Sequence, residues 1–132
     1  MTLVLDIGNT NITLGVYEGK KLLLVSRMAS DRTKMADEYA IELHEILELY
    51  GISPRQIKGS AISSVVPSVG GALTQAVRRL TGVEPLCVGP KTKTGILIDA
   101  KYLEIVGADL VVGCVAAADM FPGPCIVLDM GT

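Results

Sequence analysis

The sequence is poor in aromatic rings and in net charge, and each shortage excludes a class of partner. Its 132 residues include no Trp and one Phe, and aromatic residues make up 4% of the chain. So few rings argue against a surface on which nucleic-acid bases stack. The 12 basic and 14 acidic side chains leave a net charge of −2, which is not the basic footprint that binds nucleic acid or an anionic membrane. We therefore expect neither a nucleic acid nor a membrane as a partner.

Paired cysteines and histidines are also lacking. The three cysteines, Cys87, Cys114 and Cys125, are odd in number and never have C-x-x-C spacing, and the chain has one His. A disulfide framework and a transition-metal site are therefore not expected. The pattern predicts reduced thiols in the core of a cytoplasmic protein.

No hydrophobic run is long enough to cross a membrane. The longest uncharged part of the late apolar stretch, 110–118, is about half of the ~20 residues that a spanning helix needs. The first residues have no basic region typical of a secretory signal, and Asp6 interrupts their apolar run. Hydrophobic residues still make up 49% of the chain, which is enough to build a core.

Apolar periodicity predicts an α/β protein. Three apolar segments separated by turn residues open the chain and predict an antiparallel meander, after which helical and strand patterns alternate. The predicted strands are 2–7, 12–17, 22–27, 59–63, 85–88 and 125–129, and the predicted helices are 35–50, 67–80 and 105–120. This order, β-β-β-α-β-α-β-α-β, predicts a mixed sheet with flanking helices. No linker divides the chain, so 1–132 is expected to form a single domain.

Two apolar strand patterns end in the same kind of turn. The first is 5–11 (LDIGNTN) and the second is 128–132 (LDMGT). Glycine lets a backbone approach a phosphate, and successive N–H groups with Thr and Asn side chains can form an anion site. An Asp at a strand end can hold hydrated Mg²⁺, and phosphoryl transfer requires little beyond such positioning and charge neutralisation. Either turn alone is more often ordinary turn chemistry, but the pair favours phosphate binding.

These paired turns resemble the two phosphate loops of the acetate kinase/Hsp70/actin superfamily. Within it, the first turn is similar to that of the type III pantothenate kinases, as are the segments 62–67 (ISSVVP), 93–95 (KTG) and 106–109 (VGAD). The resemblance implies a ribonuclease H-like domain. Since family members are considerably longer, it also implies that 1–132 is an N-terminal actin-like ATPase or kinase domain. A C-terminal domain would then be missing, and this piece alone would be inactive.

The resemblance implies a specific reaction, the ATP-dependent phosphorylation of pantothenate to 4′-phosphopantothenate in coenzyme A biosynthesis. It further implies ATP as co-substrate, Mg²⁺, a monovalent cation (K⁺ or NH₄⁺) and a cytoplasmic homodimer. Two alternatives stay open. One is a non-catalytic or regulatory homologue that binds nucleotide but not pantothenate, and the other is a kinase for another small hydroxy-acid substrate.

The resemblance also implies roles for individual residues. Asp6 would hold Mg²⁺ through water, and Asp129 would hold Mg²⁺ or the monovalent cation. Asp109 would be the general base that takes the proton from the pantothenate hydroxyl. The phosphates would contact Asp6, Gly8, Asn9, Thr10, Asn11, Gly131 and Thr132, and the substrate would contact Gly107, Ala108, Asp109 and, more weakly, Tyr102.

The proposed base has a physical rationale, but its surroundings depart from the family pattern. Asp109 lies near the start of a predicted helix, where the helix dipole favours an ionised carboxylate; without the resemblance, an ordinary acidic first-turn residue is the simpler interpretation. Leu110 stands where family members usually carry Arg, and Ala100 stands where an aromatic residue is usual. Leucine cannot replace a bidentate guanidinium. Nucleotide handling is therefore better supported than pantothenate recognition.

Overall fold

The computed structural model describes residues 1–89, 91–102 and 105–130, and its centre is a five-stranded sheet in the order β3-β2-β1-β4-β5. The strands are β1 (Thr2–Ile7), β2 (Asn11–Glu18), β3 (Lys21–Ala29), β4 (Gly59–Ser64) and β5 (Leu86–Cys87). The first three strands form the predicted antiparallel meander, whereas β4 runs parallel to both β1 and β5. The predicted fold class, a mixed sheet with flanking helices, is confirmed.

The two faces of the sheet follow from the alternation of side chains along each strand. In β1, Leu3, Leu5 and Ile7 point to one face and are at most 2% exposed. Val4 and Asp6 point to the other face, because successive side chains of a strand alternate across the sheet. Asp6 therefore lies on the face opposite to the main core, near the carboxyl end of its strand.

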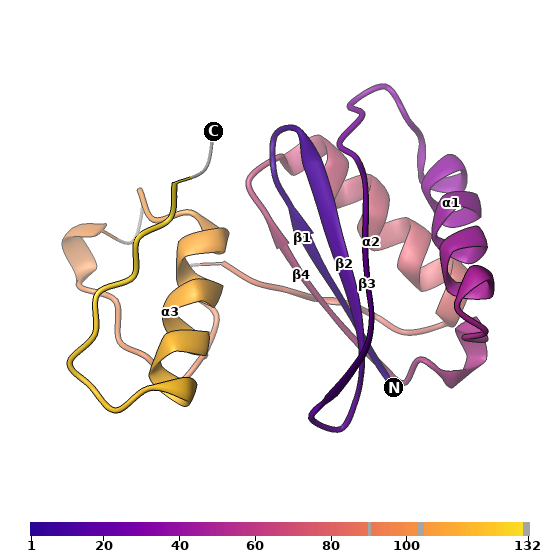
Figure 1. Cartoon of the computed structure of the whole chain (residues 1–132). Helices are drawn as coiled ribbons and strands as arrows, with labels where there is room; N and C mark the ends of the chain where they lie inside the picture. The colour runs from indigo at the N-terminus through magenta and orange to yellow at the C-terminus, as the bar shows by residue number, and fades with distance from the viewer. Residues whose placement is uncertain (90, 103–104, 131–132) are drawn as a thin grey trace.

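Two helices cover the face that carries Leu3. They are α1 (Ala36–Leu49) and α2 (Pro67–Thr81), which lie on the same side of the sheet (Figure 1). Gly82 ends α2 with a φ of 72°, a left-handed conformation that glycine adopts without the strain of a Cβ. These two helices and the sheet build the core, whose buried side chains include Leu14, Tyr39, Leu43, Ile62 and Leu73.

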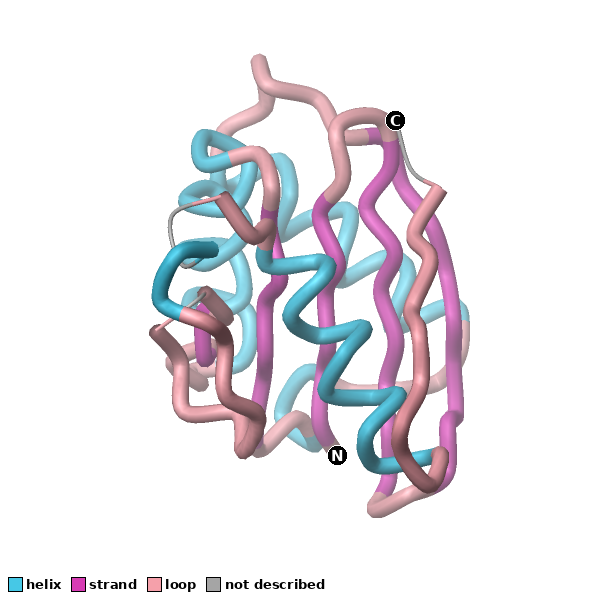
Figure 2. The backbone as a smooth tube through the Cα atoms, turned by 90° about the vertical axis from the view of Figure 1, so that its left-hand side faces the viewer, coloured by secondary structure: helices cyan, strands magenta, loops and turns pink. Residues whose placement is uncertain are grey.

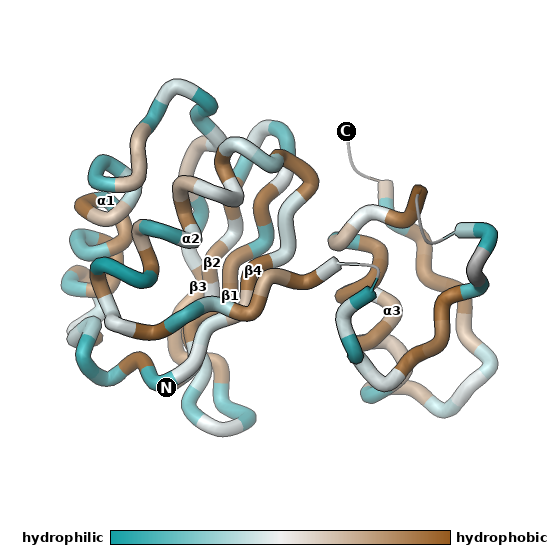
Figure 3. The backbone as a smooth tube through the Cα atoms, turned by 180° about the vertical axis from the view of Figure 1, so that it is seen from behind, coloured by the Kyte–Doolittle hydropathy of each residue, from teal (hydrophilic) through white to brown (hydrophobic). Residues whose placement is uncertain are grey.

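A third helix, α3 (Ala108–Met120), lies over the other face of the sheet (Figure 2). It starts three residues later than predicted, with Gly107 as its N-cap residue. Figure 3 marks much of α3 as hydrophobic, like the strands, yet only Ala108 and Val111 are buried in it. Among the described residues, no helix has both the length and the apolar character needed to span a membrane. Two short 3₁₀ helices, Pro54–Gln56 and Ala100–Tyr102, complete the regular structure of the part of the chain that is described.

The prediction of a strand at 125–129 is wrong, because this segment has no strand partner among the described residues. It runs back alongside α3 as an irregular chain (Figure 2). Ile126 is 88% exposed and Leu128 is 84% exposed. An apolar segment becomes a buried strand only where a sheet edge is available to satisfy its backbone groups. Composition alone does not show whether such an edge exists.

The prediction for the thiols is half right. Cys87, Cys114 and Cys125 are all free, as predicted, but all three are exposed and none lies in the core. The reason is the position of each residue in the fold. Cys87 lies in the short edge strand β5, Cys114 lies on the thinly packed α3, and Cys125 lies in the irregular segment after it.

Candidate active site

The turn between β1 and β2 is closed by its own backbone. The Gly8 N–H donates to the Asn11 carbonyl oxygen at 3.0 Å. A Cβ on Gly8 would approach that same oxygen to 3.2 Å, so glycine is the residue that allows this tight closure without adjustment. The Ser30 N–H donates to the Thr10 carbonyl oxygen at 2.9 Å. The turn is thus tied on one side to β2 and on the other to the segment after β3.

A cationic side chain that the sequence analysis did not single out lies against this turn. Arg32 Nη2 donates to Asn9 Oδ1 at 3.2 Å. The segment that carries Arg32 is ordered by Asp31, whose Oδ1 accepts the Thr33 hydroxyl at 2.6 Å and the Thr33 N–H at 2.8 Å. These bonds, the hydroxyl first, lower the pKa of Asp31 from its usual value. The guanidinium is therefore held at the edge of the predicted phosphate loop.

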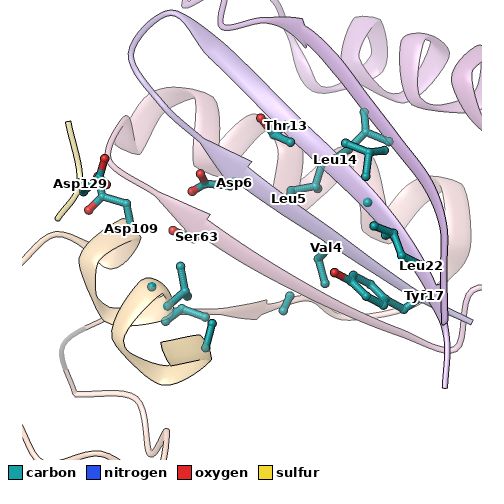
Figure 4. A pocket seen from close by; sticks show the side chains of 17 residues that line it. Val4, Leu5, Asp6, Thr13, Leu14, Tyr17, Leu22, Ser63, Asp109 and Asp129 are labelled. Atoms are coloured by element: carbon teal, nitrogen blue, oxygen red, sulfur yellow. The ribbon is translucent and has the colours of Figure 1, made fainter. Parts of the chain in front are cut away.

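Three carboxylates from distant parts of the sequence line one small cavity with this turn. Asp6 comes from β1, Asp109 from the first turn of α3 and Asp129 from the segment after α3, and together with 7–11 and Val65 they enclose about 200 Å³. Figure 4 shows Asp109 and Asp129 on the opposite side of the opening from Asp6. Within the described part of the chain, none of the three has a Lys or Arg partner. Unbalanced negative charge in a cavity attracts cations.

The arrangement fits a hydrated cation better than a fully protein-ligated one. Carboxylate oxygens are the donors that Mg²⁺ prefers. Across residues 1–89, 91–102 and 105–130, however, no three His, Cys, Asp or Glu side chains are grouped so as to hold one metal ion. Mg²⁺ keeps several waters and is commonly bound through one or two carboxylates. Asp6 and its neighbours suit that mode of binding.

Asp109 is held in place by the first turn of α3. Its Oδ1 accepts the Leu110 N–H at 2.8 Å, and the positive end of the helix dipole favours the carboxylate there. A Cβ added to Gly107 would collide with Asp109 Oδ1. Glycine at position 107 therefore leaves the space that the carboxylate occupies. Ala108, the other predicted substrate contact, is 6% exposed and packs inward.

Some predicted site residues are not brought to the cavity. Tyr102 lies in the second 3₁₀ helix, is 45% exposed and has Lys101 Nζ at 4.6 Å from its ring centroid. It lines neither the small cavity nor the larger one described next. Leu110 is 39% exposed beside Asp109. Gly131 and Thr132 fall outside the described residues.

A larger cavity of about 620 Å³ separates the sheet from α3 and shares the same three carboxylates. Its far end is apolar, with side chains such as Val4, Tyr17 and Val25. Its polar end contains Thr13 and Ser63, which the sequence analysis missed (Figure 4). Both residues pair with Asp6 in the sheet, Thr13 on β2 and Ser63 on β4. The register that places them there depends on which strands become neighbours, so the strand patterns alone did not reveal them.

Comparison with known proteins adds a family match. The model of the type III pantothenate kinase family matches residues 2–132. The chain is 42% identical over its 132 residues to the type III pantothenate kinase of Moorella thermoacetica (strain ATCC 39073 / JCM 9320) and covers 52% of that protein. It thus spans about half the length of the curated relative that it matches.

Two solved structures are similar to parts of the fold. One is a candidate N-acetylglucosamine kinase from Porphyromonas gingivalis, with a TM-score of 0.49 and 17% identity over 66% of this chain and 34% of that chain. The other is RuvC from Thermus thermophilus, with a TM-score of 0.45 and 20% identity over 93% of this chain and 83% of that chain. At these TM-scores neither likeness bears on function.

Proposed function

The chain belongs to the type III pantothenate kinase family, and from this premise we propose that the whole protein transfers the γ-phosphoryl group of ATP to the hydroxyl of pantothenate. The product is 4′-phosphopantothenate, the first intermediate on the way to coenzyme A. One observation carries the proposal. Asp6, Asp109 and Asp129, which are far apart in sequence, line one cavity together with the glycine turn at 8–11.

Asp109 acts as the general base in this proposal. Its Oδ1 is already engaged by the Leu110 N–H, which leaves Oδ2 to accept the proton of the substrate hydroxyl. The hydroxyl oxygen then forms its bond to the γ-phosphorus while the bond to the β-phosphate oxygen breaks, and ADP leaves. The hydrogen bond that orients Asp109 at the start of α3 supports this role, because a base contributes only when it is held within hydrogen-bond reach of the proton.

The turn after β1 binds the phosphates. Its backbone N–H groups and the side chains of Asn9, Thr10 and Asn11 supply donors to the phosphate oxygens. Asp6 holds Mg²⁺ through water, and bound Mg²⁺ neutralises phosphate charge. Asp129 holds Mg²⁺ or a monovalent cation, K⁺ or NH₄⁺, and Gly131 with Thr132 completes the second phosphate loop.

A cytoplasmic homodimer is part of the same proposal. Large apolar side chains are exposed in α3 and after it: Met120 (69%), Phe121 (57%), Ile126 (88%) and Leu128 (84%). Neighbouring exposed apolar residues of this kind mark surfaces that other protein segments cover. The net charge of −2 gives no reason to expect nucleic acid instead.

The direct test is mass-spectrometric detection of 4′-phosphopantothenate. The intact reading frame is incubated with ATP, Mg²⁺, K⁺ and pantothenate, alongside an Asp109→Asn variant. We expect product from the parent and a loss of about 10²–10⁴-fold in the variant, the usual contribution of a general base. ATP-dependent stabilisation of both proteins is the control for folding. A folded parent that binds ATP but makes no product would contradict the proposal.

A second candidate, a nucleotide-binding homologue that does not use pantothenate, is favoured by one residue. Leu110 directly follows Asp109, is 39% exposed and has no group that can bind a carboxylate. Thermal shift separates the two candidates, since a ligand that binds only the folded state raises the melting temperature. Stabilisation by pantothenate would support the kinase. Stabilisation by ATP alone, with no turnover, would support the homologue, and turnover of another hydroxy acid would redirect the substrate assignment.

A further inference from the structure

One buried hydroxyl in the larger cavity, between the sheet and α3, has no hydrogen-bond partner among the described residues. Ser63 is 4% exposed, and its Oγ is buried without a bond. The side chain lines the larger cavity next to Asp6 (Figure 4). Buried polar groups are nearly always bonded, so an exception needs an explanation such as a water, an ion or a ligand. Among the described residues with such an unpartnered hydroxyl, Ser30, Ser60 and Ser63, only Ser63 lines this cavity, where a bound water or ion would supply the partner.

The sheet places this hydroxyl beside the predicted ion-binding carboxylate. Asp6 and Ser63 are register partners on the parallel strands β1 and β4, and Thr13 is the partner of Asp6 on β2. The three side chains therefore form a row across adjacent strands on one face of the sheet. Neighbouring strands lie about 4.8 Å apart, a separation that one water molecule can bridge between two side chains. Asp109 reaches the cavity from α3, on the opposite side (Figure 4).

We propose that Ser63 is a positioning residue, whose hydroxyl hydrogen-bonds a water of the hydrated cation held at Asp6. The inference rests on the proposed function, because it takes the cation from that proposal. Ser63 contacts neither ATP nor pantothenate, and it acts by fixing the orientation of the water that bridges to the cation. Groups that orient the ligands of a metal typically change its affinity by about 10–100-fold when they are removed.

The same strand offers a matched control. Ser60 also lies on β4, is 8% exposed and has a buried Oγ without a partner. It is the register partner of Leu3, so it points to the α1 and α2 side of the sheet, away from Asp6. Ser60→Ala and Ser63→Ala therefore remove the same group from the same strand, on opposite faces.

The test measures Mg²⁺ affinity in the full-length protein without relying on activity. Melting temperatures are recorded at saturating ATP while Mg²⁺ is titrated, for the parent, Ser63→Ala, Ser63→Thr and Ser60→Ala. We expect the apparent Mg²⁺ dissociation constant to rise about tenfold or more in Ser63→Ala. It should stay at the parental value in Ser60→Ala and near it in Ser63→Thr, which keeps the hydroxyl. Only the Mg²⁺-dependent increment is compared, so a change in basal stability does not affect the result.

The outcomes separate this inference from the proposed function. An unchanged Mg²⁺ constant in Ser63→Ala would overturn the inference, as would an equal rise in Ser60→Ala. A parent that phosphorylates pantothenate with no Mg²⁺-dependent stabilisation would also overturn it, while leaving the proposed function intact. A parent without turnover would reject the proposed function, whereas a Ser63-dependent Mg²⁺ response would still support the role of Ser63.

Discussion

The two faces of the central sheet differ in how completely they are packed. On the α1 and α2 face, side chains such as Leu14, Leu43 and Leu73 are fully buried. On the α3 face, a cavity of about 620 Å³ separates the helix from the strands. Among the described residues, the main core cluster contains none from α3. The strands are the same, so the difference comes from what covers each face.

This difference shows how one sheet serves both stability and chemistry. The packed face buries apolar surface, which is the main favourable contribution to folding. The open face keeps carboxylates that a packed core could not tolerate: Asp6, Asp109 and Asp129, none of which has a Lys or Arg partner in the described part of the chain. Polar and charged groups cost free energy when they are buried without partners. We infer that substitutions on the two faces separate into effects on stability and effects on activity.

The largest expected effect on stability is on the packed face. Leu73→Ala should lower the free energy of unfolding by about 2–5 kcal/mol, because it leaves a void in a close-packed core. Val112→Ala, on the cavity side of α3, should cost less than about 1 kcal/mol, since its side chain already borders open space. Urea unfolding of the full-length variants measures both. Equal losses would remove the distinction between the faces.

Substitution of a glycine next to the proposed base should lower turnover strongly while changing stability little. Gly107→Ala pushes Asp109 Oδ1 from its position, and a displaced catalytic group can cost about 10- to 100-fold in turnover. The carboxylate can move aside, so the free energy of unfolding should change by less than about 1 kcal/mol. Gly113→Ala is the control, because its Cβ would meet, among the described residues outside its own helix backbone, only Val127 at an ordinary 3.7 Å. Comparable loss of turnover in both variants would contradict this account of Gly107.

Two adjacent glycines in α2 should respond oppositely to an added methyl group, because only one of them is packed against the sheet. A Cβ on Gly70 would lie 2.9 Å from Ser64 Oγ, an oxygen that is already bonded to the Val66 backbone. Gly70→Ala should therefore destabilise the protein by about 1–3 kcal/mol. A Cβ on Gly71 meets no atom of the described residues within 4 Å, so Gly71→Ala should stabilise the helix by up to about 1 kcal/mol. Thermal unfolding of the pair tests this, and changes of the same sign would refute the close packing of α2 on β4.

The smallest expected effect concerns Arg32, the cationic side chain beside the turn at 8–11. Arg32→Ala should weaken ATP binding by a few fold, since an exposed charged contact such as that with Asn9 is worth about 0–1 kcal/mol. Calorimetric titration with ATP measures the change. Arg55→Ala is the control, because Arg55 lies in the 3₁₀ helix Pro54–Gln56, beside the N-terminal end of β1. Equal weakening by both variants would indicate a general effect of charge rather than a local contact.

Much of the fold was predictable because it depends on local patterns. Apolar segments bounded by turn residues predicted the strands of the meander, and helical spacing predicted α1. The resemblance to type III pantothenate kinases, drawn from the turns and short motifs, is confirmed by the family match. The structure brings Asp6, Asp109 and Asp129 to one cavity, and their roles stay predictions.

The predictions that failed share a physical cause, because each depends on contacts between segments far apart in the sequence. The apolar pattern at 125–129 predicted a strand, but a strand needs a neighbour, and apolar composition does not supply one. The cysteines were expected in the core as reduced thiols, but their elements lie at the edges of the structure. Ser63 was seen only as part of a motif, since its place beside Asp6 depends on the register between β1 and β4.

The most direct test of the division between the two faces is amide hydrogen exchange of the full-length protein with and without ATP and Mg²⁺. We expect ligand to slow exchange in the turn at 8–11 and in the first turn of α3. The buried amides of α1 and α2 should exchange slowly in both states, with little change. Protection confined to α1 and α2, with the turn and α3 unaffected, would contradict the assignment of chemistry to the open face.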